Sequence, residues 1–130
     1  MYKRQASIGR TFPGTESITI SQSEIDALCA VIGESNTKVA PPTFSIRISL
    51  QQSEAILTSP DVGIKWDRLV HGDQKFDIKR PLKAGDVVTC SSTIESAREV
   101  AGNEIISVRS DISSGDDLLI SSWSTLVIRA

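Results

Sequence analysis

The chain has 130 residues, the length of one domain that can bury most of its apolar surface without metal or disulfide cross-links. Hydrophobic residues make up 39% and charged residues 23%, with a formal net charge of -2. This mild acidity argues against nucleic acid as a partner. The sequence has no apolar run that could cross a bilayer and no charged-then-apolar leader. We therefore expect a cytoplasmic protein without membrane contact.

The cysteines and the known short motifs give no sign of a metal or cofactor site in this sequence. Cys29 falls in an amphipathic helix pattern and Cys90 in a strand pattern. They are expected to be buried free thiols in a reducing compartment, not a disulfide pair. The sequence has no metal-ligand cluster, no phosphate loop and no Gly-x-Ser-x-Gly motif. We expect neither a metal nor a bound cofactor.

The N-terminal part of the chain predicts a boundary, a strand and a helix. Residues 1–5 lack an apolar period, and we predict that they are non-native and that a single domain spans 6–130. Ser17–Ile20 has a strand pattern, and Ser21–Glu24 has the form of a capping box. An apolar stripe at helical spacing then predicts a helix that stops at Gly33. That stripe consists of Ile25, Leu28, Cys29 and Ile32.

Gly33–Phe44 is a short polar loop between two apolar segments, and it is the first candidate for acid and base groups. The prolines in Ala40–Thr43 favour an extended chain. Phe44–Leu50 alternates between apolar and polar residues, which predicts a strand, whereas Gln51–Thr58 has a helical pattern. A buried helix rich in β-branched residues is the alternative for the first of these segments.

The remainder of the chain has the pattern of strands separated by turns. Alternating patterns predict strands over Leu69–Arg80, Val88–Glu99, a stretch holding Ile106, Val108 and Ile112, and Leu118–Arg129. The turns are predicted at Pro81–Asp86, Ala101–Asn103 and Ser113–Asp117. The last three strands are expected to form an antiparallel meander, the final one buried on both sides.

Four stretches of the sequence resemble the pattern of a known family. Leu69–Phe76 followed by Arg80–Asp86 is similar to the MaoC-like dehydratases, and more narrowly to their N-terminal-type domain, the fungal fatty-acid-synthase-like dehydratase domain. That pattern contains His-Gly-Glu-Gln-x-Phe, Arg-Pro-Leu and Gly-Asp. Ala40–Phe44 and Ser124–Arg129 fit it as well. The resemblance extends from about Ile8 to the end of the chain.

The resemblance implies an α+β hot-dog fold, in which an antiparallel sheet wraps around one long central helix. It implies that Thr43–Leu57 is this helix, in place of the strand that local alternation predicts. Family members pair two hot-dog subunits and hold a thioester of coenzyme A or acyl carrier protein in a tunnel at the interface. Their reaction is the reversible addition of water to a 2-enoyl thioester, giving the 3-hydroxyacyl form.

The family's active hydratases carry Gly-Asp-x-Asn-Pro-(aliphatic)-His. Aligned without gaps on Gly33–Val39, the Gly and Asn match, but the Asp becomes Glu34, the Pro becomes Thr37 and the His becomes Val39. Water addition needs a carboxylate and an imidazole around one water molecule. Glu34 supplies a carboxylate one methylene longer than Asp, and the imidazole is missing at this position.

His71 is the chain's single histidine. A structural role, in which its ring bonds a carbonyl at a strand start, is favoured over catalysis. The alternative is that His71 replaces the missing base and Asp73 orients it. The resemblance implies that Asn36, Pro42, Thr43, Gly72 and Asp73 contact the substrate. For Glu34 and Asn36 the alternative is a solvated helix end with Asn36 in a left-handed conformation.

Three functional hypotheses follow. The favoured one is the substrate-binding half of an (R)-specific 2-enoyl-thioester hydratase or 3-hydroxyacyl-thioester dehydratase, paired with a catalytic MaoC-like chain. The second is an autonomous hydratase, for instance a homodimer, that uses Glu34 and His71 as catalytic residues. The third is a non-enzymatic module that binds acyl thioesters. The sequence leaves the acyl chain length and the carrier open.

Overall fold

The computed structural model describes residues 8–13, 16–60 and 62–130, so the boundary predicted after residue 5 lies outside the described residues. The described elements follow one another in this order: β1 (Thr11–Pro13), β2 (Ile18–Thr19), α2 (Gln22–Ile32), α3 (Phe44–Leu57), the 3-10 turn η1 (Trp66–Arg68), β3 (Leu69–Ile78), β4 (Val87–Val100), β5 (Asn103–Ser114) and β6 (Asp117–Ile128).

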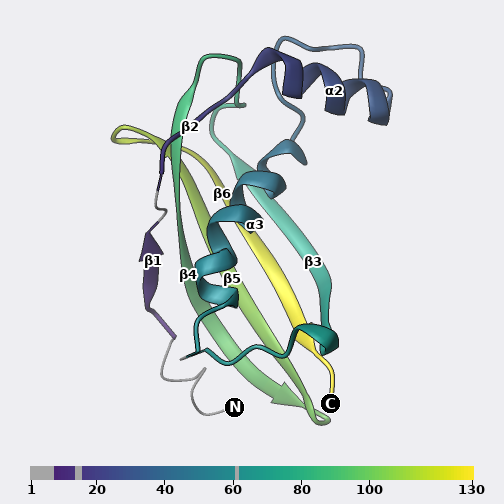
Figure 1. The fold of residues 1–130 in the computed structure, drawn as a ribbon, viewed down its shortest axis with the longest axis vertical. Helices are drawn as coiled ribbons and strands as arrows, with labels where there is room; N and C mark the ends of the chain where they lie inside the picture. Colours follow the sequence, from purple (N-terminus) through teal and green to yellow (C-terminus); the bar gives the residue numbers. More distant parts are fainter. Residues whose placement is uncertain (1–7, 14–15, 61) are drawn as a thin grey trace.

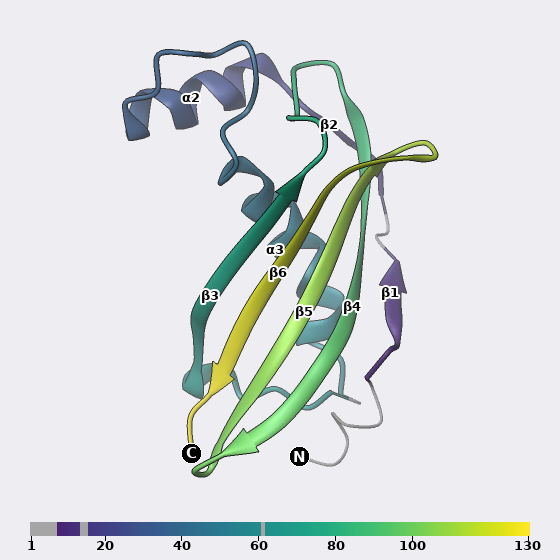
Figure 2. The same ribbon diagram turned by 180° about the vertical axis from the view of Figure 1, so that it is seen from behind.

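The strands form one antiparallel sheet in the order β1-β4-β5-β6-β3, and β2 also pairs with β4. The three long strands β4, β5 and β6 form the predicted meander, closed by tight turns. β3 lies at one edge of the sheet beside β6, so the chain passes through the Pro81–Asp86 turn to reach β4 on the far side of β6 and β5. The sheet curves around α3, which is the arrangement of a hot-dog fold (Figures 1 and 2).

The predicted helix before the loop is confirmed as α2. Its N-cap, Ser21, accepts a hydrogen bond from the Glu24 backbone nitrogen at 3.2 Å, and Gly33 ends it in the left-handed conformation at φ 76°. The Glu24 carboxylate does not complete the predicted capping box. It forms a salt bridge with Arg47 of α3 instead, which fastens the two helices together.

The strand that local alternation predicts over Phe44–Leu50 is wrong, and the family-based prediction of a central helix is confirmed by α3. Phe44 and Ile48 are buried against the sheet on one side of the helix. Ser45 and Ser49 are buried too, and their hydroxyls donate to the carbonyl oxygens of Pro42 and Ile46. Because each serine hydroxyl forms its hydrogen bond with a nearby backbone carbonyl, these polar residues can lie on the buried face of the helix. Their presence there produces the alternation that locally resembles a strand.

No described helix is long and apolar enough to span a membrane.

Two apolar clusters fill the space between α3 and the sheet. The first joins α2, the start of α3 and the adjoining ends of the strands, and it includes Ile25, Cys29, Phe44, Ile48, Leu82, Cys90, Ile112 and Ile120. The second lies toward the other end of the sheet and includes Phe12, Val62, Ile94, Ile106, Val108, Leu126 and Ile128. The thiols of both cysteines are free and buried, as predicted.

The Pro81–Asp86 turn is held by one half-buried carboxylate, that of Asp86. Arg80 donates to Asp86 through both guanidinium nitrogens, at 3.0 and 3.2 Å, and the Lys83 backbone nitrogen donates to the same carboxylate at 2.9 Å. Burial alone would raise the pKa of Asp86, but the hydrogen bonds from Arg80 and Lys83 outweigh it and keep that pKa below its usual value. The Arg-Pro-Leu and Gly-Asp parts of the family pattern therefore shape this turn.

Candidate functional site

The loop after α2 is held by hydrogen bonds between residues that are close in the sequence. The Glu34 backbone nitrogen donates to the carbonyl of Cys29, which closes the helix end. The Glu34 carboxylate accepts from the Asn36 backbone nitrogen at 2.9 Å, and the Asn36 side-chain oxygen accepts from the Lys38 backbone nitrogen at 3.1 Å. Asn36 does not adopt the left-handed conformation considered from sequence, since Ala101 is the one non-glycine residue at positive φ among those described.

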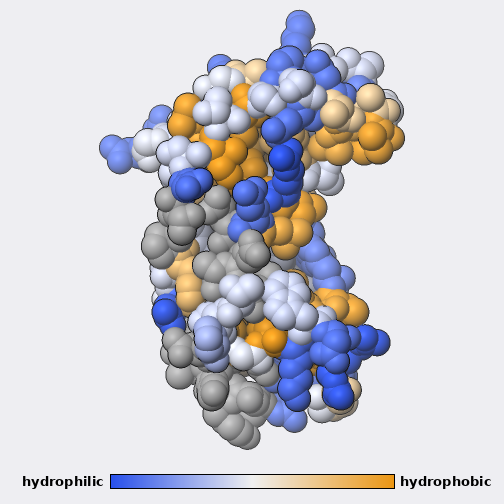
Figure 3. Space-filling model, viewed as in Figure 1, coloured by the Kyte–Doolittle hydropathy of each residue, from blue (hydrophilic) through white to orange (hydrophobic). Residues whose placement is uncertain are grey.

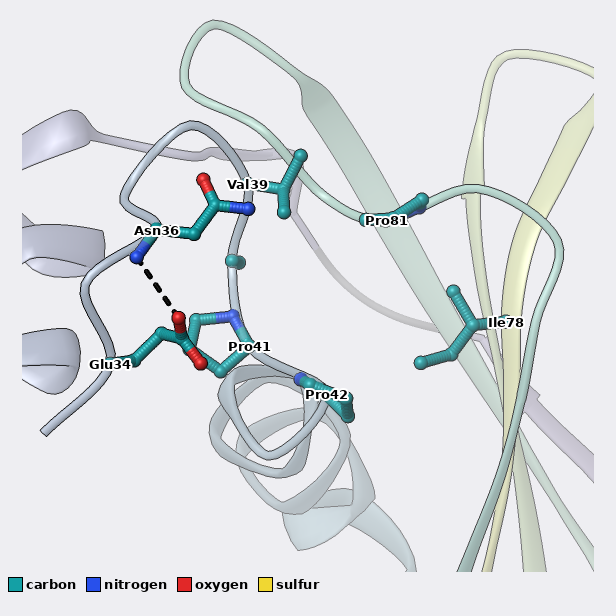
Figure 4. Close-up of a pocket in the computed structure, with 8 residues that line it drawn as sticks. Glu34, Asn36, Val39, Pro41, Pro42, Ile78 and Pro81 are labelled. Carbon is teal, nitrogen blue, oxygen red and sulfur yellow. Dashed lines mark hydrogen bonds between the residues drawn. The ribbon is translucent and has the colours of Figure 1, made fainter. Parts of the chain in front are cut away.

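This loop forms one wall of a pocket of about 200 Å³. The residues that line it are Glu34, Asn36, Val39, Ala40, Pro41, Pro42, Ile78 and Pro81. In Figure 4 the loop and the start of α3 lie on one side, while Ile78 and Pro81 face them from the end of β3 and the following turn. The pocket thus combines one carboxylate and one carboxamide with an otherwise apolar lining.

The two walls are joined by backbone hydrogen bonding. The Ala40 nitrogen donates to the carbonyl of Leu82 at 2.6 Å, and both side chains are buried in the first apolar cluster. Leu82 lies within the turn that Arg80 and Asp86 hold. The ion pair therefore fixes the position of Pro81 relative to the loop.

Cys29 lies beneath the loop. Its thiol donates to the carbonyl of Asn36 at 3.7 Å, and its side chain is buried. Burial, with a contribution from the negative charges of Glu34 and Asp26, raises the pKa of this thiol. A thiol kept protonated is a poor nucleophile, so the contact with the loop, and not nucleophilic chemistry, is the role that the geometry supports for Cys29.

His71 lies far from this pocket within the same chain. It is near the start of β3, seven residues before Ile78, a separation of roughly 20 Å along a strand. Its side chain is exposed, and its Nε2 lies 3.0 Å from the backbone oxygen of Asp73. The Asp73 carboxylate does not orient the ring as the sequence hypothesis supposed. It accepts from the Gln74 backbone nitrogen instead.

The predicted substrate-contacting residues lie in four different places. Asn36 and Pro42 line the pocket together with Glu34. Thr43 instead lines an apolar groove between α2 and α3. Asp73 lies beside Trp123 on the opposite face of the sheet. Gly72 occupies the irregularity in the β3–β6 register, where an added Cβ would lie 3.4 Å from a methyl group of Val127.

The structure adds Ile78 and Pro81 to the site, which sequence reasoning did not single out. Their pairing with the loop depends on the crossing from β3 to β4 and has no local sequence signal beyond the Arg80-Pro81-Leu82 pattern. Among the residues that the structure describes, no group of three His, Cys, Asp or Glu side chains is placed to hold a metal ion.

The sequence pattern of the FAS1-like dehydratase domain region matches residues 32–121, which include the loop, α3 and most of the sheet. The chain belongs to the FAS1-like dehydratase domain family. Its match spans both walls of the pocket, so the candidate site lies within the dehydratase region.

Bacterial relatives of this FAS1-like dehydratase domain carry the name UPF0336 protein. The Streptomyces coelicolor protein is 31% identical over 142 aligned residues, which cover 97% of this chain and 95% of that protein. The Thermobifida fusca protein is 40% identical over 92 residues, covering 70% of this chain and 60% of that protein. The first alignment is longer than the chain itself, so the Streptomyces protein has insertions that this chain lacks.

Solved structures share the fold of this FAS1-like dehydratase domain at low sequence identity. The C-terminally truncated HadBC (3R-hydroxyacyl-ACP dehydratase) complex from Mycobacterium tuberculosis has a chain that superposes with a TM-score of 0.80 at 18% identity, covering 93% of this chain and 96% of that one. HtdX from the same organism gives 0.82 at 20% identity, covering 92% of this chain and 51% of that one. The ChsH1-ChsH2 complex, also from that organism, gives 0.66 at 16% identity, covering 98% and 87%. The domain therefore shares its hot-dog fold with the HadBC dehydratase and, at a TM-score of 0.82, with a solved MaoC-like dehydratase.

Proposed function

We propose that this chain is the substrate-binding half of an (R)-specific 2-enoyl-thioester hydratase, or 3-hydroxyacyl-thioester dehydratase, in acyl-CoA or fatty-acid metabolism. In this proposal a second hot-dog subunit supplies the catalytic Asp and His. The thioester is carried on coenzyme A or acyl carrier protein, and the chain binds no cofactor of its own.

The observation that carries the proposal is the composition of the pocket. Glu34 provides a carboxylate there, but the position of the family's histidine is held by Val39, an aliphatic side chain that cannot exchange protons. The chain's single imidazole, on His71, is roughly 20 Å away along β3. Hydration requires both groups around one water molecule, so this chain needs an imidazole from elsewhere.

The proposal of a second hot-dog subunit has separate support. The chain resembles subunits of the HadBC and ChsH1-ChsH2 complexes, each of which joins two different chains. An apolar groove between α2 and α3 is also open to solvent, and it is lined by Ala27, Leu28, Val31 and Phe44 among others. Val31 is 84% exposed there, and hydrophobic side chains gather on α2 in Figure 3. Exposed apolar surface of this kind is typical of an interface.

The autonomous hydratase remains the second candidate, favoured by one observation. Glu34 follows directly after the C-terminus of α2, where the helix dipole disfavours a carboxylate. A residue kept there against the dipole is consistent with a chemical role. In a homodimer the missing imidazole would be the partner copy's, brought to the pocket across the interface.

The deciding experiment assays the purified chain on crotonyl-CoA, alone and co-expressed with a MaoC-like chain that retains Asp and His. We expect no turnover from the chain alone and turnover from the co-purified pair. In the pair, Glu34→Gln and His71→Ala should each change kcat by no more than about twofold relative to the unmodified pair. The reason is that the Asp and His that transfer protons in the reaction belong to the other subunit.

Two outcomes would refute this assignment. Turnover by the chain alone that is abolished by His71→Ala would establish the autonomous hydratase. Binding of decanoyl-CoA without turnover in any pairing would establish the non-enzymatic acyl-thioester module.

A further inference from the structure

A band of polar side chains crosses the face of the sheet that α3 covers. Ser92 of β4 pairs with Ser110 of β5, which pairs with Ser122 of β6. In the adjoining row Ser124 of β6 pairs with Gln74 of β3. Because alternate residues of a strand share a face, this band lies between the two apolar clusters, with Ile112 and Ile120 on one side and Val108 and Leu126 on the other.

Two atoms of this band have no hydrogen-bond partner among the described residues. The Ser92 and Ser110 hydroxyls are 3.0 Å apart, and Ser124 donates to the Gln74 side-chain oxygen at 2.7 Å. The hydroxyl of Ser122, which is 1% exposed, and the side-chain nitrogen of Gln74 are buried without a partner. Such atoms are rare in native proteins, and an ordered water molecule, an ion or a functional role generally accounts for them.

The two unpartnered atoms are close enough for one ligand atom to reach both. Gln74 lies opposite Ser124, so Ser122 is its diagonal neighbour, with Cβ atoms about 7 Å apart. An oxygen atom placed between them can accept from the Gln74 amide and exchange a hydrogen bond with the Ser122 hydroxyl. If the Gln74 side-chain amide is flipped, its oxygen is the unpartnered atom in place of its nitrogen. A ligand hydroxyl can both donate and accept, so it fits either orientation of the amide.

The band lies in line with the pocket at the candidate site. Ile78 forms part of the pocket, and Phe76 and Gln74 follow at alternate positions of β3 on the same face. Gln74 is four residues from Ile78, about 13 Å along the strand. A linear acyl chain that enters over Ile78 and follows β3 therefore meets Phe76 first and the Gln74–Ser122 pair near its far end.

We propose that Gln74 and Ser122 form a recognition site for a neutral oxygen, a hydroxyl or a ketone, near the distal end of the acyl chain. The substrate class is then an acyl thioester oxygenated far from the thioester, and a plain alkyl chain is disfavoured because it leaves both atoms unpaired. Neither side chain carries a charge, so a neutral oxygen fits better than a carboxylate. This inference rests on the proposed function, since it takes an acyl thioester as the ligand.

The test compares ω-hydroxydecanoyl-CoA with decanoyl-CoA, each titrated calorimetrically into the full chain. We expect the hydroxylated thioester to bind about tenfold more tightly. Ser122→Ala and Gln74→Leu should each remove most of that preference, while decanoyl-CoA binds at least as tightly as before because its alkyl chain leaves fewer polar atoms unpaired. Ser92→Ala, which changes the same band away from β3, is the matched control and should keep the preference.

The possible failures are distinguishable. Equal affinities for the two thioesters, with both binding, would overturn the distal oxygen site and leave the proposed function standing. A crystal structure with a water molecule retained between Gln74 and Ser122 while ω-hydroxydecanoyl-CoA is bound would also overturn it. If neither thioester binds the chain or its complex, the proposed function fails as well. Decanoyl-CoA binding and the circular dichroism spectrum report whether each variant is folded.

Discussion

The backbone nitrogen of Ala40 lies 2.6 Å from the carbonyl oxygen of Leu82. This hydrogen bond joins the candidate-site loop to the turn between β3 and β4, two segments about forty residues apart in the sequence. Leu82 is 1% exposed, so the bond is anchored in the core. The shape of the pocket therefore depends on a turn that carries none of the proposed chemistry.

The first prediction concerns the ion pair that holds this turn. Asp86→Asn removes the charge that Arg80 and the Lys83 amide share, and it should lower the free energy of unfolding by about 1–3 kcal/mol. Urea denaturation near pH 7 measures this loss. Asp116→Asn, in the exposed turn before β6, is the control and should change stability by less than about 0.5 kcal/mol. Equal effects of the two substitutions would contradict the role given to Asp86.

The second prediction is the pH dependence of that effect. The pKa of Asp86 is lowered in the folded chain, so its stabilisation is complete above its unfolded pKa of about 3.9 and is lost as the pH falls through the lower folded value. The stability difference between the wild type and Asp86→Asn should therefore be constant from pH 5 to 7 and shrink below about pH 4. Denaturation curves at a series of pH values test this. A difference that grows on acidification would show that the pKa is raised instead.

The third prediction concerns the residue that directs the chain from α2 into the loop. Gly33 has φ 76°, a conformation that a residue with a Cβ adopts only at a cost, although no neighbouring atom would obstruct that Cβ. Gly33→Ala should destabilise the chain by about 1 kcal/mol. Gly33→Asn should cost less, because Asn tolerates this conformation. Thermal unfolding of the two variants provides the comparison, and identical midpoints would rule out backbone strain as the cause.

Local sequence patterns were sufficient where each residue satisfies the rule of its own element. Ser21 and Gly33 bound α2 as predicted, and the β5–β6 hairpin turns at the predicted residues. The patterns failed at Phe44–Leu50, where Ser45 and Ser49 are buried by bonding to their own helix backbone. Periodicity alone cannot distinguish this from a strand, and the family resemblance decided in favour of the helix.

The candidate site could be predicted only on its local side. Glu34, Asn36 and Pro42 are near one another in the sequence, and the structure brings them into one pocket. The facing wall was not predictable, because β3 pairs with β6 at the far edge of the sheet and Ile78 meets the loop only through that crossing. The same crossing places His71 away from the loop, at the other end of the strand.

The fourth prediction concerns the thiol in the centre of the sheet. Cys90 is 1% exposed, and burial, only partly offset by hydrogen bonding to Ser92 and Ser110, raises its pKa to about 11. The reactive thiolate is therefore scarce at neutral pH. The native protein should react with iodoacetamide at Cys90 at least a hundredfold more slowly than the protein unfolded in urea. Peptide mass spectrometry after timed labelling measures both rates, and similar rates would contradict the burial of this thiol.

The last prediction tests the pocket itself with two matched substitutions. Val39 is half-buried in the pocket, whereas Val31 is 84% exposed on α2. Val39→Asp places a second carboxylate beside Glu34, and an acyl chain bound there would have to desolvate it, which costs about 1–3 kcal/mol. Val39→Asp should therefore weaken decanoyl-CoA binding by about tenfold or more, and Val31→Asp should leave it unchanged. Calorimetric titration of the two variants decides. If Val31→Asp weakens binding while Val39→Asp does not, the acyl thioester lies in the groove between α2 and α3, and the pocket at Glu34 is not the binding site.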